Sequence, residues 1–312
     1  MTPTTVPLSP GSPGPAPRPR PTDPALLAVL RRLDADPRVQ AASAALREAS
    51  AELRWSQVLR RRWREARAEA NLCCAVASGA VEGAVVPLGL LRERVARAEL
   101  TQAASGDPAL DAVTALWRAG THLNELMPDL GGAGGGRRVP SRELLAGLHR
   151  DLVAPLVASG QLTQRQVAAP RRDGEEPLEG GPGQAPQGLE LRARLEGLLD
   201  LLDLPQAPAL VRAALVHAEL VTARPFAAGN AALGRLLVRH LVVRDGLEPT
   251  GTAVAEAYPA RAPQAYREAA SAYASADPDG VAAWVVWQAE ALLVGLEEAQ
   301  VLLRRVQAGR SR

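Results

Sequence analysis

The sequence predicts an all-α protein with one short β-hairpin. Apolar residues recur at helical spacing over most of the chain after position 24. Stretches rich in Gly and Pro interrupt this pattern at intervals that suit helices. A single stretch, GQLTQRQVAAP at 160–170, has the Gln, Thr and Val character of a hairpin. With 312 residues and 47% hydrophobic content, the chain can bury a sizeable core in one large or two modest domains.

Composition and charge exclude several classes of protein. All 36 basic residues are Arg and are interleaved with 34 acids, which indicates the codon bias of a GC-rich bacterial genome and not a nucleic-acid surface. Cys73 and Cys74 are adjacent and have no His or Cys partners at metal-binding spacing. We therefore expect a cytoplasmic protein without a metal-binding cysteine cluster. No run of about 18 uninterrupted apolar residues is present, so we expect no membrane span.

The first hundred residues divide into a tail and a helical region. Residues 1–23 are rich in Pro, Ser, Thr and Gly and predict a disordered tail, although their PRPRP run leaves a proline-docking partner open. Helical patterns at 24–36 and 37–71 predict an N-terminal helical region over 24–100. Its basic cluster LRRRWREAR raises the question of nucleic-acid contact, but Glu65 and Glu69 dilute the charge and favour a solvated helix face.

A second pattern in this region combines a hydroxyl, an acid and a glycine. Ser78 and Glu82 are four residues apart, which places them on one helical face, and Gly83 would end that helix. A buried carboxylate here would need a cation. On spacing alone, a solvent-facing Glu near a helix end is the simpler interpretation.

Residues 101–308 predict a second, helical domain. Helical patterns cover 100–127, 141–156, 189–202 and 208–223. The glycine-rich stretch at 131–139 lacks the strand and the spacing of a P-loop or dinucleotide fingerprint and predicts a loop. A short loop, RPFAAGN, then separates two apolar helical patterns and contains Phe226, the only Phe of the chain. Gly229 and Asn230 lie where a helix begins, so their amides predict a phosphate cradle.

The stretch RPFAAGNAALGRLL resembles the signature of the Fic (Fido) family, His-Pro-Phe-x-Asp/Glu-Gly-Asn-Gly-Arg-x-x-Arg. The preceding helix AALVHAELVT and the closing segment YPARAPQAYREAASAYASADPDGVAAWVVWQAEALL are also similar to the family. Residues 78–83 match its N-terminal inhibitory motif, Ser/Thr-x-x-x-Glu-Gly/Asn. The resemblance covers about residues 70–300 and implies an all-α Fic-type helical bundle with additional N-terminal helices. It implies a substrate-docking flap formed by Leu162, Thr163, Gln164, Arg165, Gln166 and Val167.

The resemblance also implies a chemistry. Typical Fic enzymes transfer AMP from ATP to a protein hydroxyl with Mg²⁺, using a His as base and an acidic residue to hold the metal. Their loop amides and final Arg bind phosphates, and the inhibitory Glu pairs with that Arg. Carried over residue by residue, the phosphate-binding groups are Gly229, Asn230, Arg235 and Arg224, and the inhibitory motif is Ser78, Glu82 and Gly83.

Several positions depart from the family pattern. Arg224 occupies the position of the His, and Ala228, Ala231 and Ala232 occupy those of the metal acid, the second Gly and the first Arg. A general base contributes about 10²–10⁴ in rate, and a permanently protonated Arg cannot replace it. We therefore expect a pseudoenzyme that binds ATP, another nucleotide or phosphate without Mg²⁺. His217, two helical turns earlier, is expected to have a packing role.

Two questions stay open at this point: the role of Arg224 and the function of the chain. Arg224 adds a cation to the cradle, or it pairs with Glu219 and binds nothing. A residual or altered protein adenylyltransferase inhibited by Glu82 is the second function, and it predicts contact between Glu82 and Arg235. An interaction scaffold is the third. Expected partners are a protein target at the flap, and a homodimer is compatible with the sequence; no membrane or nucleic-acid partner is expected.

Overall fold

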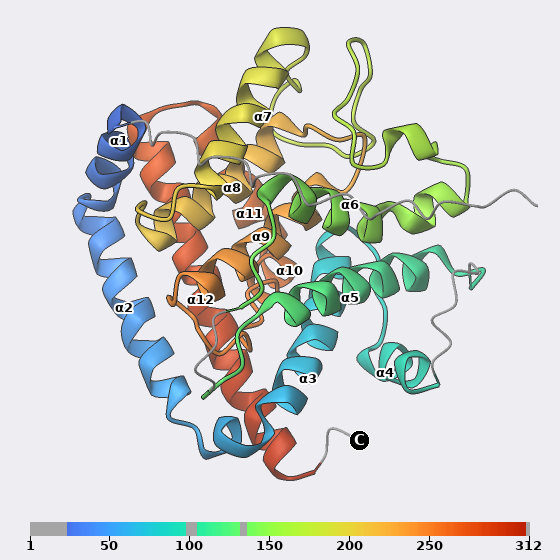
Figure 1. Ribbon diagram of the computed structural model, residues 1–312, viewed down its shortest axis with the longest axis vertical. Helices are drawn as coiled ribbons and strands as arrows, with labels where there is room; N and C mark the ends of the chain where they lie inside the picture. The colour runs from blue at the N-terminus through green and yellow to red at the C-terminus, as the bar shows by residue number, and fades with distance from the viewer. Residues whose placement is uncertain (1–23, 98–104, 132–135, 310–312) are drawn as a thin grey trace, which may run out of the picture.

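The computed structural model describes residues 24–97, 105–131 and 136–309. The predicted tail at 1–23 lies outside these residues. In the described part, the chain forms an all-α fold and contains no strand (Figure 1). The elements are α1 (Pro24–Asp34), α2 (Pro37–Arg54), α3 (Gln57–Val81), α4 (Leu88–Ala96), α5 (Pro108–Leu126), α6 (Ser141–Ala158), the 3₁₀ turn η1 (Gln164–Gln166), α7 (Gly188–Leu202), α8 (Ala209–Ala223), α9 (Asn230–Arg244), α10 (Ala257–Arg261), α11 (Pro263–Ala274) and α12 (Pro278–Gln307).

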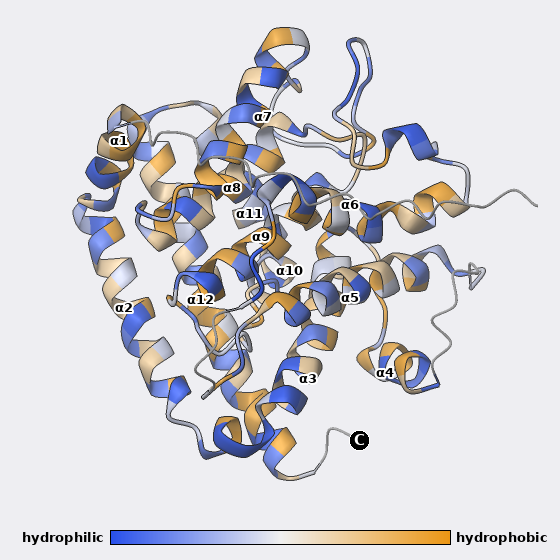
Figure 2. Cartoon of the chain, viewed as in Figure 1, coloured by the Kyte–Doolittle hydropathy of each residue, from blue (hydrophilic) through white to orange (hydrophobic). Residues whose placement is uncertain are grey.

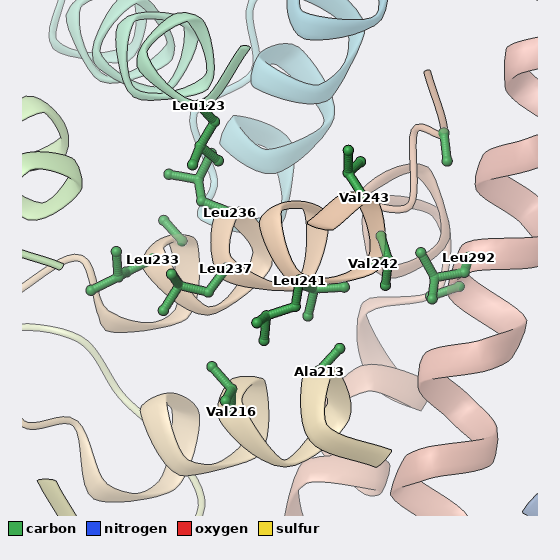
Figure 3. Close-up of a cluster of buried hydrophobic side chains, with 14 of the residues drawn as sticks. Leu123, Ala213, Val216, Leu233, Leu236, Leu237, Leu241, Val242, Val243 and Leu292 are labelled. Carbon is green, nitrogen blue, oxygen red and sulfur yellow. The ribbon is translucent and has the colours of Figure 1, made fainter. Parts of the chain in front are cut away.

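Helix α9 lies at the centre of the fold, and most of its residues are buried. Leu237 points toward Val216 on α8, its most extensive packing partner (Figure 3). Leu236 points toward Leu123 on α5, and Val242 lies beside α12 (Figure 3). α9 is buried on nearly all sides, including its Arg235 and Arg239 side chains, so protein surrounds it as expected for a core helix. This burial fixes the start of α9, where the candidate cradle lies.

Helix α12 forms a second axis of the molecule and packs against α2, α3, α8, α10 and α11 (Figure 1). It is long and apolar enough to cross a membrane by length and composition. However, 56% of its most apolar 18-residue window is buried inside the fold. Its apolar composition is therefore explained by packing between the N-terminal helices and the rest of the bundle.

The N-terminal helix α2 shows how the sequence pattern determines this packing. Its buried residues Val39, Ser43, Leu46, Ser50 and Leu53 follow a spacing of four and three residues. That spacing lines one face of a helix, and the exposed residues of α2 are mainly Arg, Glu, Gln and Ala (Figure 2). The stripe packs against α12.

Three helices begin with the same local signal, an Asp followed by Pro. Asp36, Asp107 and Asp277 cap α2, α5 and α12, and each side chain accepts a hydrogen bond from a backbone amide of the first turn. The following Pro supplies a fixed φ and has no N–H to leave unpaired. These caps pair amides that would otherwise lack a partner and fix where the three helices begin.

The predicted β-hairpin at 160–170 is wrong. The described residues there contain the 3₁₀ turn η1 and no strand. Thr163 and Gln166 form a capping box, in which the Gln166 side-chain oxygen accepts the Thr163 N–H at 2.8 Å. Such local side-chain bonds satisfy the backbone without a partner strand, and they compete with strand pairing.

Candidate functional site

The loop between α8 and α9 is fixed by two left-handed residues and one amide side chain. Arg224 ends α8 at φ 44°, and Gly229 precedes α9 at φ 78°. The Asn230 side chain closes the loop, because its Nδ2 donates to the Phe226 carbonyl and its Oδ1 accepts the Phe226 N–H, both at 2.8 Å. The amides of Gly229 and Asn230 are thereby directed away from the helix, as predicted for an anion-binding site.

A carboxylate of the protein itself occupies these two amides. Glu179 Oε2 accepts the Gly229 N–H at 2.7 Å, and Glu179 Oε1 accepts the Asn230 N–H at 2.6 Å. Burial raises the pKa of Glu179, and the nearby Glu82 carboxylate adds to this increase. The two amides therefore point to one place, as predicted for a cradle, and the Glu179 carboxylate occupies it.

Glu179 belongs to a segment that we call the strap, residues 171–187, which precedes α7 (yellow-green in Figure 1). The strap lies against the loop between α8 and α9 (residues 224–229), which we call the motif loop, through backbone hydrogen bonds. The Arg171 N–H donates to the Pro225 carbonyl at 2.8 Å, and the Leu178 N–H donates to the Ala227 carbonyl at 2.8 Å. The strap is thus bonded to the loop at two points, and Glu179 follows directly after the second of them.

The Arg171 side chain fastens the strap to the end of α8. Its guanidinium is buried and donates to the carbonyls of Arg224 at 2.7 Å, Pro186 at 3.0 Å and Ala223 at 3.3 Å, and also to that of Glu175. Burial lowers the pKa of Arg171. One side chain therefore joins both ends of the strap to the motif loop.

Arg224, which the resemblance places at the position of the family's His, also turns toward the strap. Its Nη2 donates to the Gly183 carbonyl at 2.7 Å, and burial lowers its pKa. The alternative pairing with Glu219 is wrong, because Glu219 accepts hydrogen bonds from Arg194 at 2.9 Å and from the Tyr273 hydroxyl at 2.7 Å. Arg224 thus offers a positive charge beside the cradle and no group that could accept a proton.

The expected contact between Glu82 and Arg235 is present. Glu82 follows α3 as its C-terminal cap, and its Oε1 accepts a hydrogen bond from Arg235 Nη2 at 2.6 Å. Ser78 Oγ accepts from Arg235 Nε at 2.9 Å, and Gly83 leaves the helix at φ 84°. The Arg235 side chain is 4% exposed, whereas that of Glu82 is 37% exposed. Burial alone would lower the pKa of Arg235, but Glu82 raises it overall.

The two histidines nearest the loop are held as neutral rings. His149 Nδ1 accepts the Ala168 N–H at 2.8 Å, so its Nε2 donates to the Ala228 carbonyl at 3.0 Å. Burial lowers the pKa of His149 to about 4. His217 contacts Gln288 at 2.8 Å and the Tyr266 hydroxyl at 3.1 Å, and burial lowers its pKa to about 3. Both rings use both nitrogens, so neither is placed as a general base.

A pocket of about 400 Å³ opens beside the cradle, and its lining includes Glu82, Glu179, Ala228 and Gly229. The described residues contain no group of three or more His, Cys, Asp or Glu side chains that could hold a metal ion. With the three carboxylates of Glu82, Asp111 and Glu179 on its wall, the pocket in this conformation repels an anion. A phosphate could enter the cradle only after Glu179 leaves it.

The predicted flap residues lie beside the strap. Gln166 Nε2 donates to Glu175 of the strap, and Leu162 is buried. Thr163, Gln164, Arg165 and Val167 complete this turn. Sequence reasoning missed Glu179, Arg171 and His149. For Glu179, the only signal was the acid-rich run DGEEPLEG, which does not indicate which of its acids reaches the loop.

Known proteins resemble this chain in sequence, through a family model, and in structure. Residues 139–242 match the model of the Fic/DOC family. A Fic family protein from Desulfovibrio desulfuricans G20 has a similar structure, with a TM-score of 0.59 and 20% identity over 92% of this chain and 77% of that one. A fragment of Fic-1 from C. elegans gives a TM-score of 0.56 and 18% identity over 89% of this chain and 73% of that one. No curated protein sequence matches the chain. At these identities, the structural likeness concerns the fold.

Proposed function

We propose that this chain, whose residues 139–242 match the model of the Fic/DOC family, is a degenerate Fic-fold protein without the usual AMP transfer. It acts by binding a nucleotide, another phosphate ligand or a protein. The observation that carries this proposal is Arg224 at the position of the family's catalytic His. A guanidinium stays protonated at neutral pH and cannot deprotonate an incoming hydroxyl.

The surroundings of the loop support the same proposal. His149 and His217 are neutral, buried and hydrogen-bonded through both nitrogens, so no described histidine near the loop replaces the missing base. Ala228 stands where the family has its metal-binding acid. Losing the base and the metal acid removes both proton transfer and charge neutralisation from one site.

The binding groups that remain are suited to phosphate. They are the amides of Gly229 and Asn230, the guanidinium of Arg235, and Arg224 as a second cation close to the loop. Two backbone amides at a helix start and two guanidinium groups provide the donors that phosphate oxygens accept. We propose ATP or another nucleotide as the ligand, bound without a requirement for Mg²⁺.

The pairing of Glu82 with Arg235 favours a second function. In this alternative, the chain is a residual or altered protein adenylyltransferase that Glu82 inhibits, because an inhibitory pair has a purpose only where something is inhibited. The 2.6 Å contact between the two side chains supports it. Replacing Glu82 by Gly would then free Arg235 for the terminal phosphate.

Two experiments test these functions. Calorimetric titration of the wild-type and Glu82→Gly chains with ATP, ADP and GTP, each with Mg²⁺ and with EDTA, measures binding; we expect Glu82→Gly to bind at least one nucleotide. Absence of binding in every variant that frees Arg235 or the cradle rejects nucleotide binding. Incubation of Glu82→Gly with labelled ATP and cell lysate tests catalysis. Label on any protein, including the chain itself, overturns the pseudoenzyme in favour of the transferase.

Partners and location are proposed from the sequence. We propose a cytoplasmic protein whose protein target docks near residues 162–167, with a homodimer as a further arrangement compatible with the fold. Chemical cross-linking followed by mass spectrometry tests this, because cross-links from elsewhere on the surface would place the target at another site.

A further inference from the structure

The contact between Glu179 and the cradle imitates the binding of a ligand. Its two carboxylate oxygens each accept one amide, from Gly229 at 2.7 Å and from Asn230 at 2.6 Å. This is the bidentate arrangement that a phosphate group would make with the same N–H groups. Glu179 therefore occupies the position of the anion and does not merely lie near it.

A second carboxylate occupies the other strong phosphate-binding group. Glu82 accepts a hydrogen bond from Arg235 at 2.6 Å, and burial of Arg235 leaves little room for another anion. Arg224 donates to Gly183 on the same strap as Glu179. Of the four groups proposed to hold phosphate, the two amides and Arg235 donate to carboxylates, and Arg224 donates to a strap carbonyl. Arg235 Nη1 and Arg224 Nε are buried and have no hydrogen-bond partner among the described residues.

Polar bonds, and not apolar packing, hold the strap around Glu179: the Leu178 N–H donates to the Ala227 carbonyl, and Arg224 donates to the Gly183 carbonyl. Leu178 is 60% exposed, so apolar packing does not hold this segment. Gly180 follows Glu179 directly, and no atom lies within 4 Å of the position of its absent Cβ. Burial also disfavours the Glu179 carboxylate, as its raised pKa indicates. The amide bonds therefore offset a desolvation cost that a departing side chain would recover.

We propose that Glu179 is a second internal inhibitor of the phosphate cradle, which a phosphate ligand must displace before it can bind. This inference rests on the proposed function, because it concerns the same site. It differs from inhibition by Glu82 in the group that is blocked: Glu179 blocks the amides of α9, and Glu82 blocks Arg235.

The expected effect follows from population arithmetic. A ligand that binds only when the cradle is open has its apparent affinity reduced by the fraction of molecules in the open state. A carboxylate held by two amides keeps that fraction low. Removing the Glu179 carboxylate should tighten ATP, ADP or pyrophosphate binding by roughly ten- to a hundredfold.

The test is calorimetric titration of the full chain with ATP, ADP and pyrophosphate. We compare wild type with Glu179→Ala and with Glu179→Gln. In Glu179→Gln, an NH2 group replaces one of the two carboxylate oxygens, and this group cannot accept the hydrogen bond of a backbone N–H. The matched control is Glu176→Ala, since Glu176 lies on the same strap but accepts only from Gln187 at the surface. Both Glu179 variants should bind at least tenfold tighter than wild type, and Glu176→Ala should bind as wild type does.

Hydrogen exchange gives a readout that does not depend on a ligand. The amides of Gly229 and Asn230 should exchange faster in Glu179→Ala than in wild type or Glu176→Ala, because their acceptors are lost.

The outcomes distinguish failure of the inference about Glu179 from failure of the proposed function. If Glu82→Gly binds nucleotide but the Glu179 variants bind no tighter than wild type, the inference is wrong and the proposed function stands. If no variant binds, including the Glu82→Gly/Glu179→Ala double variant, both are rejected. Unchanged exchange at Gly229 and Asn230 in Glu179→Ala also overturns the inference.

Discussion

Arg171 is the residue on which attachment of the strap depends. Its buried guanidinium donates to four carbonyls, on both the strap and the end of α8. Replacing it by Ala leaves these acceptors without a donor in a buried region. We expect Arg171→Ala to lower the free energy of unfolding by about 2–4 kcal/mol, measured by urea denaturation.

Arg172 provides the matched control for this substitution. It is the next residue of the strap, and its side chain is exposed. Arg172→Ala should change the free energy of unfolding by less than about 0.5 kcal/mol. Equal effects of the two substitutions would show that Arg171 does not fasten the strap.

His149 and His217 are predicted to stay neutral well below the pH at which a histidine usually titrates. Burial lowers their pKa values to about 4 and about 3. Because the unfolded chain binds these protons near pH 6.5, the contribution of both rings to stability is complete above that pH and is lost as the pH falls toward 4. NMR of the ring nitrogens at pH 5 should show neutral rings for His149 and His217, and also for His240, whose pKa burial lowers to about 4.

A titration of either ring near pH 6.5 would contradict this prediction. It would also reopen the question of a general base. A ring that gains a proton at physiological pH could accept one from a substrate hydroxyl. Substituting His149→Phe and His217→Phe separately assigns the two NMR signals.

The residues of the site differ in how far sequence could predict them. Glu82 and Arg235 were predicted as a pair because both lie in motifs with fixed spacing, and their contact is confirmed. Glu179 could not be predicted, since its position depends on the path of an irregular strap. The direction of Arg224 depended on the same path, and its pairing with Glu219 was excluded only by the structure.

At the scale of elements, α8 and α9 approach closely at one glycine. A Cβ at Gly234 would lie 2.6 Å from His217 Cδ2. His217 cannot move easily, because Gln288 and Tyr266 hold its ring. We expect Gly234→Ala to lower the free energy of unfolding by about 1–3 kcal/mol through overpacking, measured by thermal and urea denaturation.

Gly197 on α7 is the control for helix propensity. No atom lies within 4 Å of its absent Cβ. Gly197→Ala should therefore stabilise the protein, by about 0.5–1 kcal/mol, because Ala has the higher helix propensity. A destabilising Gly197→Ala, or a neutral Gly234→Ala, would contradict the packing that we describe.

The elements also show where periodicity suffices and where it fails. The stripe of α2 and the Asp-Pro starts of three helices are local signals, so these helices could be predicted. The segment 160–170 has the composition of a hairpin, but a strand needs a partner that composition does not supply. The capping box of Thr163 and Gln166 stabilises a 3₁₀ turn there, which needs no partner strand.

At the scale of the whole molecule, the all-α class followed from patterns repeated along the chain. The arrangement of helices around α9 was implied only by the resemblance to the Fic family. Long-range packing, such as that of α2 on α12, depends on contacts between segments more than 200 residues apart in sequence. The division into 24–100 and 101–308 stays a prediction.

The central claim is that the chain retains a phosphate-binding site without metal-dependent chemistry. Calorimetric titration of the Glu82→Gly/Glu179→Ala double variant with ATP, in Mg²⁺ and in EDTA, tests it most directly. Both internal carboxylates are then absent, and Ala228 leaves no acid at the family's metal position. We predict binding with dissociation constants that agree within about twofold in Mg²⁺ and in EDTA. Binding that requires Mg²⁺, or no binding at all, would contradict the claim.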